Sequence, residues 1–397
     1  MDDRYDLSTS TRLRRITATT AITDRLAWVA TCTALLLGAL ACDAPTRPAI
    51  DRRALVSAHS RAGARSAMEW TTELGTFTLL PTPDSSIYAY VHGISPNGDS
   101  TMGVTWTQIG HPPYTDMAYE VGFNSANLSY VYRAGFPTWG KAINDAGDVV
   151  GVYFDSAVVG NPQHAFLFHE GAYSEIVFPG SMTTGANGIN NSGTVVGGYT
   201  MPDGAHHGFT YADGAFTSFD LPDSFGACNS SAVAINSHGT IVGFYRVSQL
   251  PLLCGSARDQ GYIRDSDGTF TAFDATAHAT LTRAFGINDQ GDIVGRYHTM
   301  DGKDHGFLRR GNGEPTITVD FPTGAPVTQL NGIDRSGRII VGNVFAAGPN
   351  SGRPFKLTLC DSGDHNQQQQ GRNRVGTHGG PDEQCGNQDQ AATRSRD

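Results

Sequence analysis

Apolar and polar positions follow one short pattern that recurs six times along the chain. In each copy a small residue, Ile and Asn precede two variable residues, a Gly, and a β-branched run that ends at a second Gly. The successive isoleucines are 49, 46, 46, 52 and 46 residues apart. A fixed period of about 20–50 residues is typical of repeat architectures. The regular copies are 142–151, 188–197, 234–243 and 286–295, and two looser copies are 93–103 and 332–342.

The Asn-x-x-Gly part of each copy predicts a tight turn between two short strands. Asn favours the first position of a type I turn, and the Gly can take the positive φ of a bulged hairpin. The second Gly, inside a strand, indicates close backbone approach. We assign these structural roles to Asn144, Asn190, Asn236 and Asn288, and to Gly147, Gly193, Gly239, Gly291 and Gly337.

A second hairpin follows about 15 residues later in the pattern. Its first strand carries a triplet of His, a small residue and Phe, and a further strand such as 215–222 completes the unit. One repeat therefore has four strands, and neighbouring sheets can cover its two faces. The triplets begin at His164, His207 and His305, to which we assign a structural role within the repeat.

These elements predict an all-β fold: a six-bladed β-propeller of four-stranded antiparallel blades. Gly75–Pro81 matches the end of a repeat, and the last copy stops after Arg353–Leu357 without its final strand. The two ends of the array can therefore share one blade and close the ring. An open β-solenoid is the alternative.

The two motifs together resemble the bacterial extracellular repeats of the HAF family. The resemblance covers residues 70–359, with Gln260 and Arg353 in place of the His and no clear triplet in the first repeat. It implies an exported repeat protein and defines no reaction.

The N-terminus predicts export. Arg12, Arg14 and Arg15 precede the uncharged stretch Leu26–Ala41, whose 16 residues are short for a membrane-spanning helix. Ala39-Leu40-Ala41-Cys42 resembles a bacterial lipobox, which predicts a lipid on Cys42. A short membrane anchor and an ordinary cleaved signal are the alternatives.

The predicted organisation has four parts. These are an export signal of the lipoprotein type (1–41), a flexible tether (42–66), the propeller repeat domain (67–360) and a disordered low-complexity tail (361–397). We expect an extracytoplasmic protein, anchored at the bacterial cell envelope by its lipid or secreted.

Composition narrows the class of partner. The 48 glycines among 397 residues agree with many turns and few helices. The formal charge of −10 lacks the basic footprint of nucleic-acid binding. It also gives no electrostatic attraction to an anionic membrane surface, so the lipid alone would hold the protein there.

The motifs of the sequence do not define a catalytic, cofactor or metal site. Equivalent His residues in separate blades could surround Zn²⁺, but a residue repeated at one position usually serves its own blade. Asp-rich turns do not have the spacing of the EF-hand calcium loop.

The longest insert, 107–138, contains Tyr114, Tyr119 and Phe123. Aromatic side chains on a rigid scaffold can stack on a sugar or bind a partner protein, which makes these three a possible ligand-binding loop. The alternative is that part of the insert forms strands three and four of the first blade.

Four cysteines remain outside the predicted signal and lipid site. Exported proteins commonly form disulfides. Cys228 and Cys254 bracket the first hairpin of the fourth repeat, which predicts that they pair. Cys360 and Cys385 are then left as the second pair.

The predicted function is non-enzymatic binding of a protein or glycan at the cell envelope, through the loop face of the propeller. An exported polysaccharide hydrolase or lyase is the alternative. An active site should gather unmatched Asp, Glu, His or Arg residues at one mouth of the ring, whereas a structural or adhesive ring should show only repeat-equivalent polar residues there.

The lipobox generates the first testable prediction. Replacement of Cys42 by Ser should release the protein from membranes into the extracytoplasmic soluble fraction, because the thiol that receives the lipid is lost. Cys32→Ser, within the same uncharged stretch, should leave the protein on the membrane. Cell fractionation and mass spectrometry of the mature N-terminus provide the measurement, and a mature chain that does not start at Cys42 would contradict the prediction.

Overall fold

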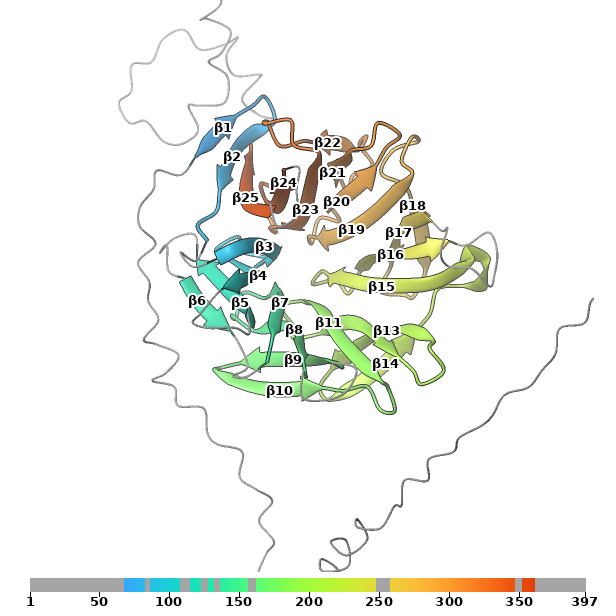
Figure 1. The fold of residues 1–397 in the computed structure, drawn as a ribbon. Helices are drawn as coiled ribbons and strands as arrows, with labels where there is room; N and C mark the ends of the chain where they lie inside the picture. Colours follow the sequence, from blue (N-terminus) through green and yellow to red (C-terminus); the bar gives the residue numbers. More distant parts are fainter. Residues whose placement is uncertain are drawn as a thin grey trace, which may run out of the picture. The chain divides into compact units, whose positions relative to one another are not determined.

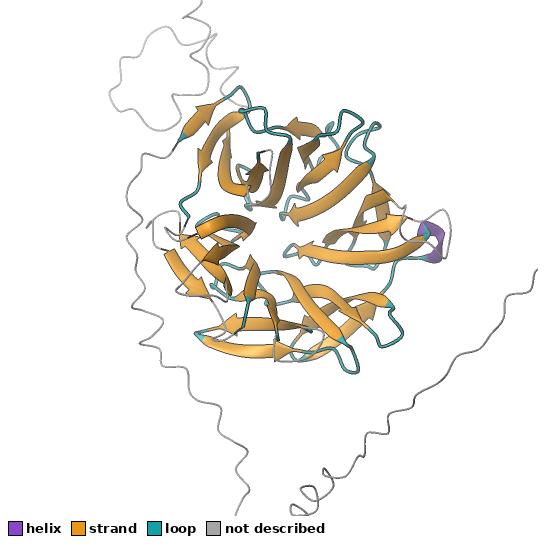
Figure 2. Cartoon of the chain, in the orientation of Figure 1, coloured by secondary structure: helices purple, strands orange, loops and turns teal. Residues whose placement is uncertain are grey.

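The fold is described by a computed structural model. Its described residues are 68–82, 86–107, 115–122, 128–131, 136–155, 162–247, 258–346 and 352–360. They belong to one compact unit, Arg52–Asp397. Nearly all secondary structure among them is β-strand, with one short 3-10 helix, η1 (Asp223–Phe225), so the predicted all-β class is confirmed (Figure 2). None of this described part forms a helix long and apolar enough to cross a membrane. The predicted signal, tether and tail lie outside the described residues.

Four sheets each contain four antiparallel strands that follow one another along the chain. The first is β3 (Ser86–Ile94), β4 (Ser100–Thr107), β5 (Thr115–Gly122) and β6 (Leu128–Val131). The second is β7 (Thr138–Ile143), β8 (Val149–Phe154), β9 (Gln163–His169) and β10 (Ala172–Ile176). The third is β11 (Thr183–Ile189), β12 (Val195–Thr200), β13 (His206–Ala212) and β14 (Ala215–Phe219). The fourth is β15 (Ala227–Ile235), β16 (Ile241–Val247), β17 (Arg258–Arg264) and β18 (Phe270–Phe273).

The remaining strands form a nine-stranded sheet with two antiparallel parts. One part is β19 (Leu281–Ile287), β20 (Ile293–His298), β21 (Asp304–Arg309) and β22 (Ile317–Val319). The other is β23 (Val327–Ile333), β24 (Ile339–Phe345), β25 (Gly352–Leu359), β2 (Gly75–Leu79) and β1 (Glu69–Thr71). A single parallel pair, Asp304 with Val327, joins the two parts.

The two ends of the repeat array meet in this last sheet. β2 pairs antiparallel with β25 from Gly75 opposite Leu359 to Leu79 opposite Phe355. The expected pairing of the N-terminal strand with the last repeat is therefore confirmed. The first strand of every repeat lies nearest the centre around which the sheets are arranged (Figure 1).

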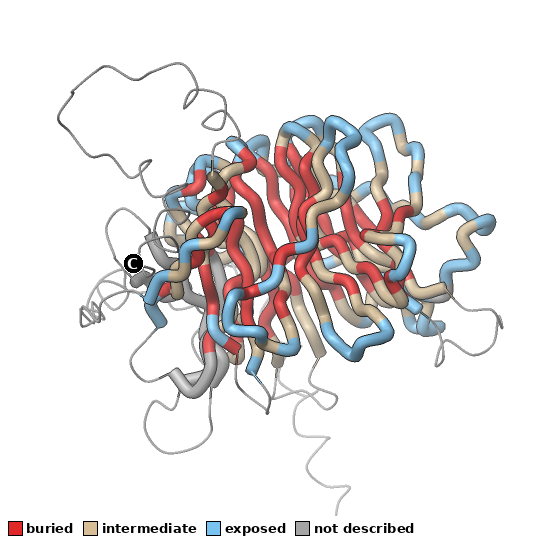
Figure 3. Tube along the Cα trace, turned by 90° about the horizontal axis from the view of Figure 1, so that it is seen from above, coloured by how far each residue is buried: buried red, intermediate tan, exposed pale blue. Residues whose placement is uncertain are grey.

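Each sheet packs against the next one along the chain. β7 contacts β4 and β5, β11 contacts β8 and β9, β15 contacts β12 and β13, and β19 contacts β16 and β17. β23 contacts β20 and β21, and β3 contacts β23, β24 and β25. Buried residues follow the strands between neighbouring sheets, while exposed residues gather at the turns (Figure 3).

In the second to sixth repeats, the aromatic residue of the triplet is buried next to the second Gly of the repeat. Phe209 is fully buried and pairs across the strands with Gly197. A Cβ on Gly197 would lie 1.9 Å from the carbonyl oxygen of Gly185 and 3.0 Å from the Phe209 ring. The two repeated motifs are therefore one packing unit. Its other copies pair Gly151 with Phe166, Gly243 with Tyr262, Gly295 with Phe307 and Gly342 with Phe355.

The Asn-x-x-Gly segments form the predicted turns. The Gly193 N–H donates to the Asn190 carbonyl at 3.1 Å, and Gly193 has a φ of 78°. The equivalent glycines Gly147, Gly239, Gly291 and Gly337 have φ between 72° and 82°.

The Asn side chain of these turns also holds the next repeat. Asn190 Oδ1 accepts from the backbone N–H groups of Ser192 and Thr194, and its Nδ2 donates to the Asn236 carbonyl at 3.0 Å. Because an amide both accepts and donates, one buried residue satisfies its own turn and its neighbour's. The other links run from Asn144 to Asn190, from Asn236 to Asn288 and from Asn288 to Asp334, at 3.3, 3.1 and 3.2 Å.

This series of links, which we call the asparagine ladder, ends at Asp334. The Asp334 carboxylate accepts from the N–H groups of Arg338 and Ile339. Between the last repeat and the first, Asn343 exchanges two hydrogen bonds with the Val91 backbone at 2.8 and 2.9 Å. Asn331 Nδ2 adds a third bond to the Val91 carbonyl at 2.6 Å. Side-chain amides therefore join repeats at this seam as well.

The close packing at Gly197 predicts a large effect of one methyl group. Gly197→Ala should destabilise the protein by about 1–3 kcal/mol, because either the Gly185 backbone or the Phe209 ring must move. Gly198→Ala is the matched control, since its Cβ would lie 3.3 Å from the His207 carbonyl, where a small shift suffices. Urea unfolding checks this, and equal midpoints for the two variants would contradict it.

The asparagine ladder predicts that the side-chain N–H donor of each asparagine stabilises the protein independently of the side-chain oxygen that accepts in its own turn. Asn236→Asp keeps an oxygen for the turn but removes the N–H that reaches the Asn288 carbonyl. Leaving that buried carbonyl without its donor should cost about 1–3 kcal/mol in thermal unfolding. His238→Ala, at an exposed position of the same turn, should change stability little. An Asn236→Asp protein as stable as the wild type would refute a linking role for the amide.

Candidate functional site in the central cavity

Each innermost strand carries an irregularity at the same point of the repeat. The pairing of β3 with β4 skips one residue between Val91 and Gly93, and that of β7 with β8 skips one between Gly140 and Ala142. Such β-bulges turn a side chain away from its regular direction and are common beside active sites. The six skipped residues, which we call the bulge residues, are His92, Lys141, Asn187, Val233, Phe285 and Asn331.

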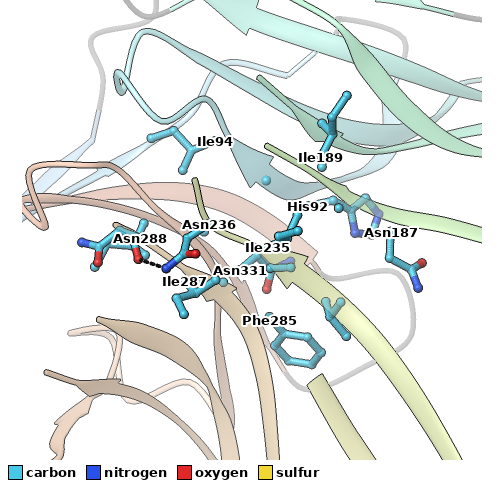
Figure 4. A pocket seen from close by; sticks show the side chains of 18 of the residues that line it. His92, Ile94, Asn187, Ile189, Ile235, Asn236, Phe285, Ile287, Asn288 and Asn331 are labelled. Carbon is cyan, nitrogen blue, oxygen red and sulfur yellow. Dashed lines mark hydrogen bonds between the residues drawn. The ribbon is translucent and has the colours of Figure 1, made fainter. Parts of the chain in front are cut away.

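All six bulge residues line one central cavity of about 380 Å³. His92, Asn187, Phe285 and Asn331 appear around it in Figure 4. This volume lies in the range of about 300–1,000 Å³ that is typical of small-molecule sites. The repeats therefore build one scaffold and present six side chains of differing chemistry to a single space.

The small residue after each bulge explains how the inner strands come together. A Cβ on Gly332 would lie 2.9 Å from the Ile94 side chain and 3.0 Å from the Ile94 backbone nitrogen. A Cβ on Gly188 would lie 2.8 Å from the Val233 carbonyl. Larger residues at this place would separate neighbouring inner strands and change the cavity.

Two of the bulge residues are used by the scaffold. Asn187 Nδ2 donates to the Ala232 carbonyl at 2.8 Å. Asn331 Nδ2 reaches Val91, as described above, and its Oδ1 accepts from Gln329 Nε2 at 2.8 Å. Their amides join adjacent inner strands, so we assign them a structural role.

His92 and Lys141 differ from these amides. His92 Nε2 is buried and has no hydrogen-bond partner. Burial, and then the nearby charge of Lys141, hold the pKa of His92 well below its ordinary value. Burial also lowers the pKa of the Lys141 amine to about 8. Perturbed groups in a cavity are typical of functional sites.

Three arginines that line the cavity are held by carboxylates. Arg283 Nε lies 2.6 Å from Oδ2 of the buried Asp259, and its guanidinium lies 4.9 Å from the Phe244 ring centroid. Arg296 Nη1 lies 3.1 Å from Asp304 Oδ2. These ion pairs keep the guanidinium groups at fixed places in the wall.

The third arginine, Arg335, lies at the turn end of the cavity. Its Nη2 is 2.8 Å from Asp145 Oδ2 and its Nε is 3.4 Å from Asp289 Oδ2. These carboxylates come from the second and fifth copies of the turn, while Arg335 belongs to the sixth. The side chain therefore spans this mouth, and the carboxylates raise the pKa of Arg335.

Of the three aromatic residues that the sequence predicted in a ligand-binding loop, the one that the structure describes lies in a strand. Tyr119 lies in strand β5, opposite Gly103 on one side and Tyr130 on the other. The insert thus supplies strands three and four of its sheet, as the alternative interpretation expected. Tyr114 and Phe123 lie outside the described residues.

The repeated His residues lie within their own sheets. His207 stacks on Tyr199 and its Nδ1 is 2.8 Å from Asp220 Oδ1. His305 stacks on Tyr297 in the same way, with its Nδ1 2.9 Å from Asp320. His164 stacks on Tyr153, with the rings 5.0 Å apart. Within the described ranges, no group of three or more His, Cys, Asp or Glu side chains could hold a metal ion.

The cysteines are only partly described. Cys228 lies in β15, while Cys254 and Cys42 lie outside the described residues, so that pairing stays a prediction. Cys360 is in a disulfide, and Cys385, its expected partner, lies outside the described residues.

Sequence reasoning did not single out the six bulge residues. Their signal was present: each directly precedes the small residue of the small-Ile-Asn motif. The residue at this position differs in chemistry between otherwise similar repeats, from Lys to Phe. Side chains that vary on a repeated scaffold mark the place where function can reside.

The strand pairing defines an all-β protein built from four-stranded antiparallel sheets. A family model described as "Protein of unknown function (DUF3466)" matches residues 130–331, which is 202 of the 397 residues. The chain belongs to this family. No curated protein matches the sequence.

Several solved structures are similar at low identity. Putative TolB from Agrobacterium tumefaciens has 12% identity and a TM-score of 0.44, over 72% of this chain and 94% of that one. TolB from Acinetobacter baumannii has 11% identity and a TM-score of 0.42, over 74% and 78% of the two chains. A mutant of AofleA from Arthrobotrys oligospora has 12% identity and a TM-score of 0.42, over 74% and 87%. With TM-scores below 0.5, these likenesses carry no argument about this protein.

Proposed function

We propose that this protein is an exported six-bladed β-propeller, tethered to the cell envelope through Cys42, that binds a ligand in its central cavity. The pairing of β2 with β25, and the contacts of β3 with β23, β24 and β25, support a closed ring of six four-stranded blades. The single parallel pair between β21 and β23 then belongs to the boundary between two blades. The HAF-type motifs and the N-terminal signal support export.

The observation that carries the binding function is the set of six bulges that open on one cavity. A ring with a purely structural role needs only repeat-equivalent residues at its centre. This centre instead has an imidazole, an amine, two amides, a branched aliphatic and a phenyl group. We therefore place the binding site in the cavity rather than on the loop face.

The size of the cavity favours a glycan over a folded protein as ligand. About 380 Å³ accommodates a mono- or disaccharide or the end of a longer chain. Phe285 and Phe244 offer faces for a sugar ring, while the amides and charged groups can bind hydroxyl and carboxylate groups.

Filling the cavity tests this proposal. Val233→Trp should place an indole among the bulge residues and weaken glycan binding by at least about tenfold, or about 1.4 kcal/mol. Val177→Trp is the control, because Val177 is 48% exposed on the outside of the protein. Binding of the purified full chain is measured on a panel of neutral and acidic mono- and oligosaccharides, with product formation followed in parallel.

Two outcomes would overturn the proposal. Equal binding by both variants would place the site outside the cavity. Turnover of a polysaccharide that stops in Val233→Trp would instead establish the alternative function, an exported hydrolase or lyase.

A further inference from the structure

Lys141 differs from the arginines of the cavity in the contacts that the structure describes for it. Arg283, Arg296 and Arg335 each form an ion pair with an aspartate. Within the described part of the chain, no carboxylate lies at ion-pair distance from Lys141 Nζ. The described contact of its ammonium group is a cation–π contact with the Trp139 ring, whose centroid lies 4.9 Å from Nζ. An unpaired ammonium group in a partly enclosed site is costly, and an anionic ligand would compensate for that cost.

His92 lies on the neighbouring inner strand and provides the second observation. The strands meet closely here, since a Cβ on Gly93 would lie 3.0 Å from the Lys141 carbonyl. Both side chains come from bulges and both line the cavity. A buried nitrogen without a partner, such as His92 Nε2, usually indicates a missing ligand or water. The cavity is therefore lined by two nitrogen-bearing side chains, His92 and Lys141, that can donate hydrogen bonds to a ligand.

We propose that the cavity binds a small organic acid whose carboxylate accepts hydrogen bonds from Lys141 Nζ and His92 Nε2. This inference rests on the proposed binding function of the cavity and names its ligand class. The body of the acid, a ring with hydroxyl groups as in a hexuronate, lies against Phe285. Charge-assisted hydrogen bonds of this kind are about twice as strong as neutral ones.

The charge of Lys141 gives the site a defined pH dependence. The bound carboxylate favours the protonated amine, so the pKa of Lys141 is higher in the complex than the value of about 8 in the free protein. Affinity is therefore greatest below pH 8 and falls as the pH rises through that value, by up to about tenfold per unit for one coupled proton.

The strands around β7 and the turn mouth carry other titratable residues. They are Tyr90 and His92 on β3, Asp116, Tyr119 and Glu120 on β5, and Tyr153 on β8, with Asp145 and Arg335 at the turn mouth. Burial raises the pKa of Tyr90. The pKa shifts of His92 and Arg335 are described above. A substitution at Lys141 itself separates its contribution from theirs.

The test measures binding of glucuronate and galacturonate to the full chain by calorimetry, beside glucose, galactose and inorganic phosphate. We expect the acids to bind at least about tenfold more tightly than the neutral sugars, the difference that 1.4 kcal/mol produces. Lys141→Met should remove this preference. Lys141→Arg should retain the preference but lose the decline above pH 8, because guanidinium stays protonated.

Two further variants separate the local roles. His92→Leu removes the second donor and should weaken binding of the acids, whereas His92→Gln retains a donor and should weaken it less. Lys303→Met is the matched control, since Lys303 is exposed and is not among the residues that line the cavity, and it should change nothing. Thermal unfolding of every variant verifies that the fold is retained.

The remaining outcomes distinguish failure of the acid site from failure of the cavity as a glycan-binding site. Equal binding of acids and neutral sugars, unchanged in Lys141→Met but lost in Val233→Trp, would refute the acid site and leave the cavity as a neutral glycan site. Tight binding of phosphate with none of the uronates would show a site for inorganic anions and overturn the organic-acid class. Absence of binding by every probe would overturn the inference together with the proposed ligand class of the cavity.

Discussion

The structure depends on one buried amide in each of four consecutive repeats. Asn190 closes its own turn with Oδ1 and holds the next turn with Nδ2, and three other asparagines repeat this geometry. Serine or aspartate can cap a turn, but neither can also donate to a carbonyl one repeat away with the same geometry. The residue that shapes the hairpin is thus also the residue that sets the spacing between neighbouring sheets.

The turn and the core of the sheet reinforce each other through glycine. The second strand of a repeat has no side chain at Gly197, so the Phe209 ring and the Gly185 carbonyl can occupy that space. The inner strands can approach one another for the same reason, as at Gly332 and Ile94. The high glycine content of the chain therefore reflects close packing as well as turns. Packing this tight leaves the inner strands few alternative positions.

This rigidity is what allows a functional site at the centre. A bulge moves one side chain out of the regular alternation, and the scaffold repeats the bulge on every inner strand. The amides of Asn187 and Asn331 join neighbouring strands, whereas His92 Nε2 has no hydrogen-bond partner among the described residues and Lys141 lines the same cavity. The Arg335 side chain and its two aspartates cover the turn mouth. Structural roles and the proposed ligand-binding roles are thereby divided among equivalent positions.

The sequence by itself determined the local structure, because turns and hairpins depend on residues a few positions apart. The Asn-x-x-Gly spacing specified the turns, and the small residues and buried aromatics specified which strands pair. Tertiary structure alone decided the cavity. His92 and Lys141 are 49 residues apart in the chain, and their proximity results from the packing of two sheets. Which residue bulges depends on the register between paired strands, and the contacts of Lys141 depend on what the neighbouring repeats place around it.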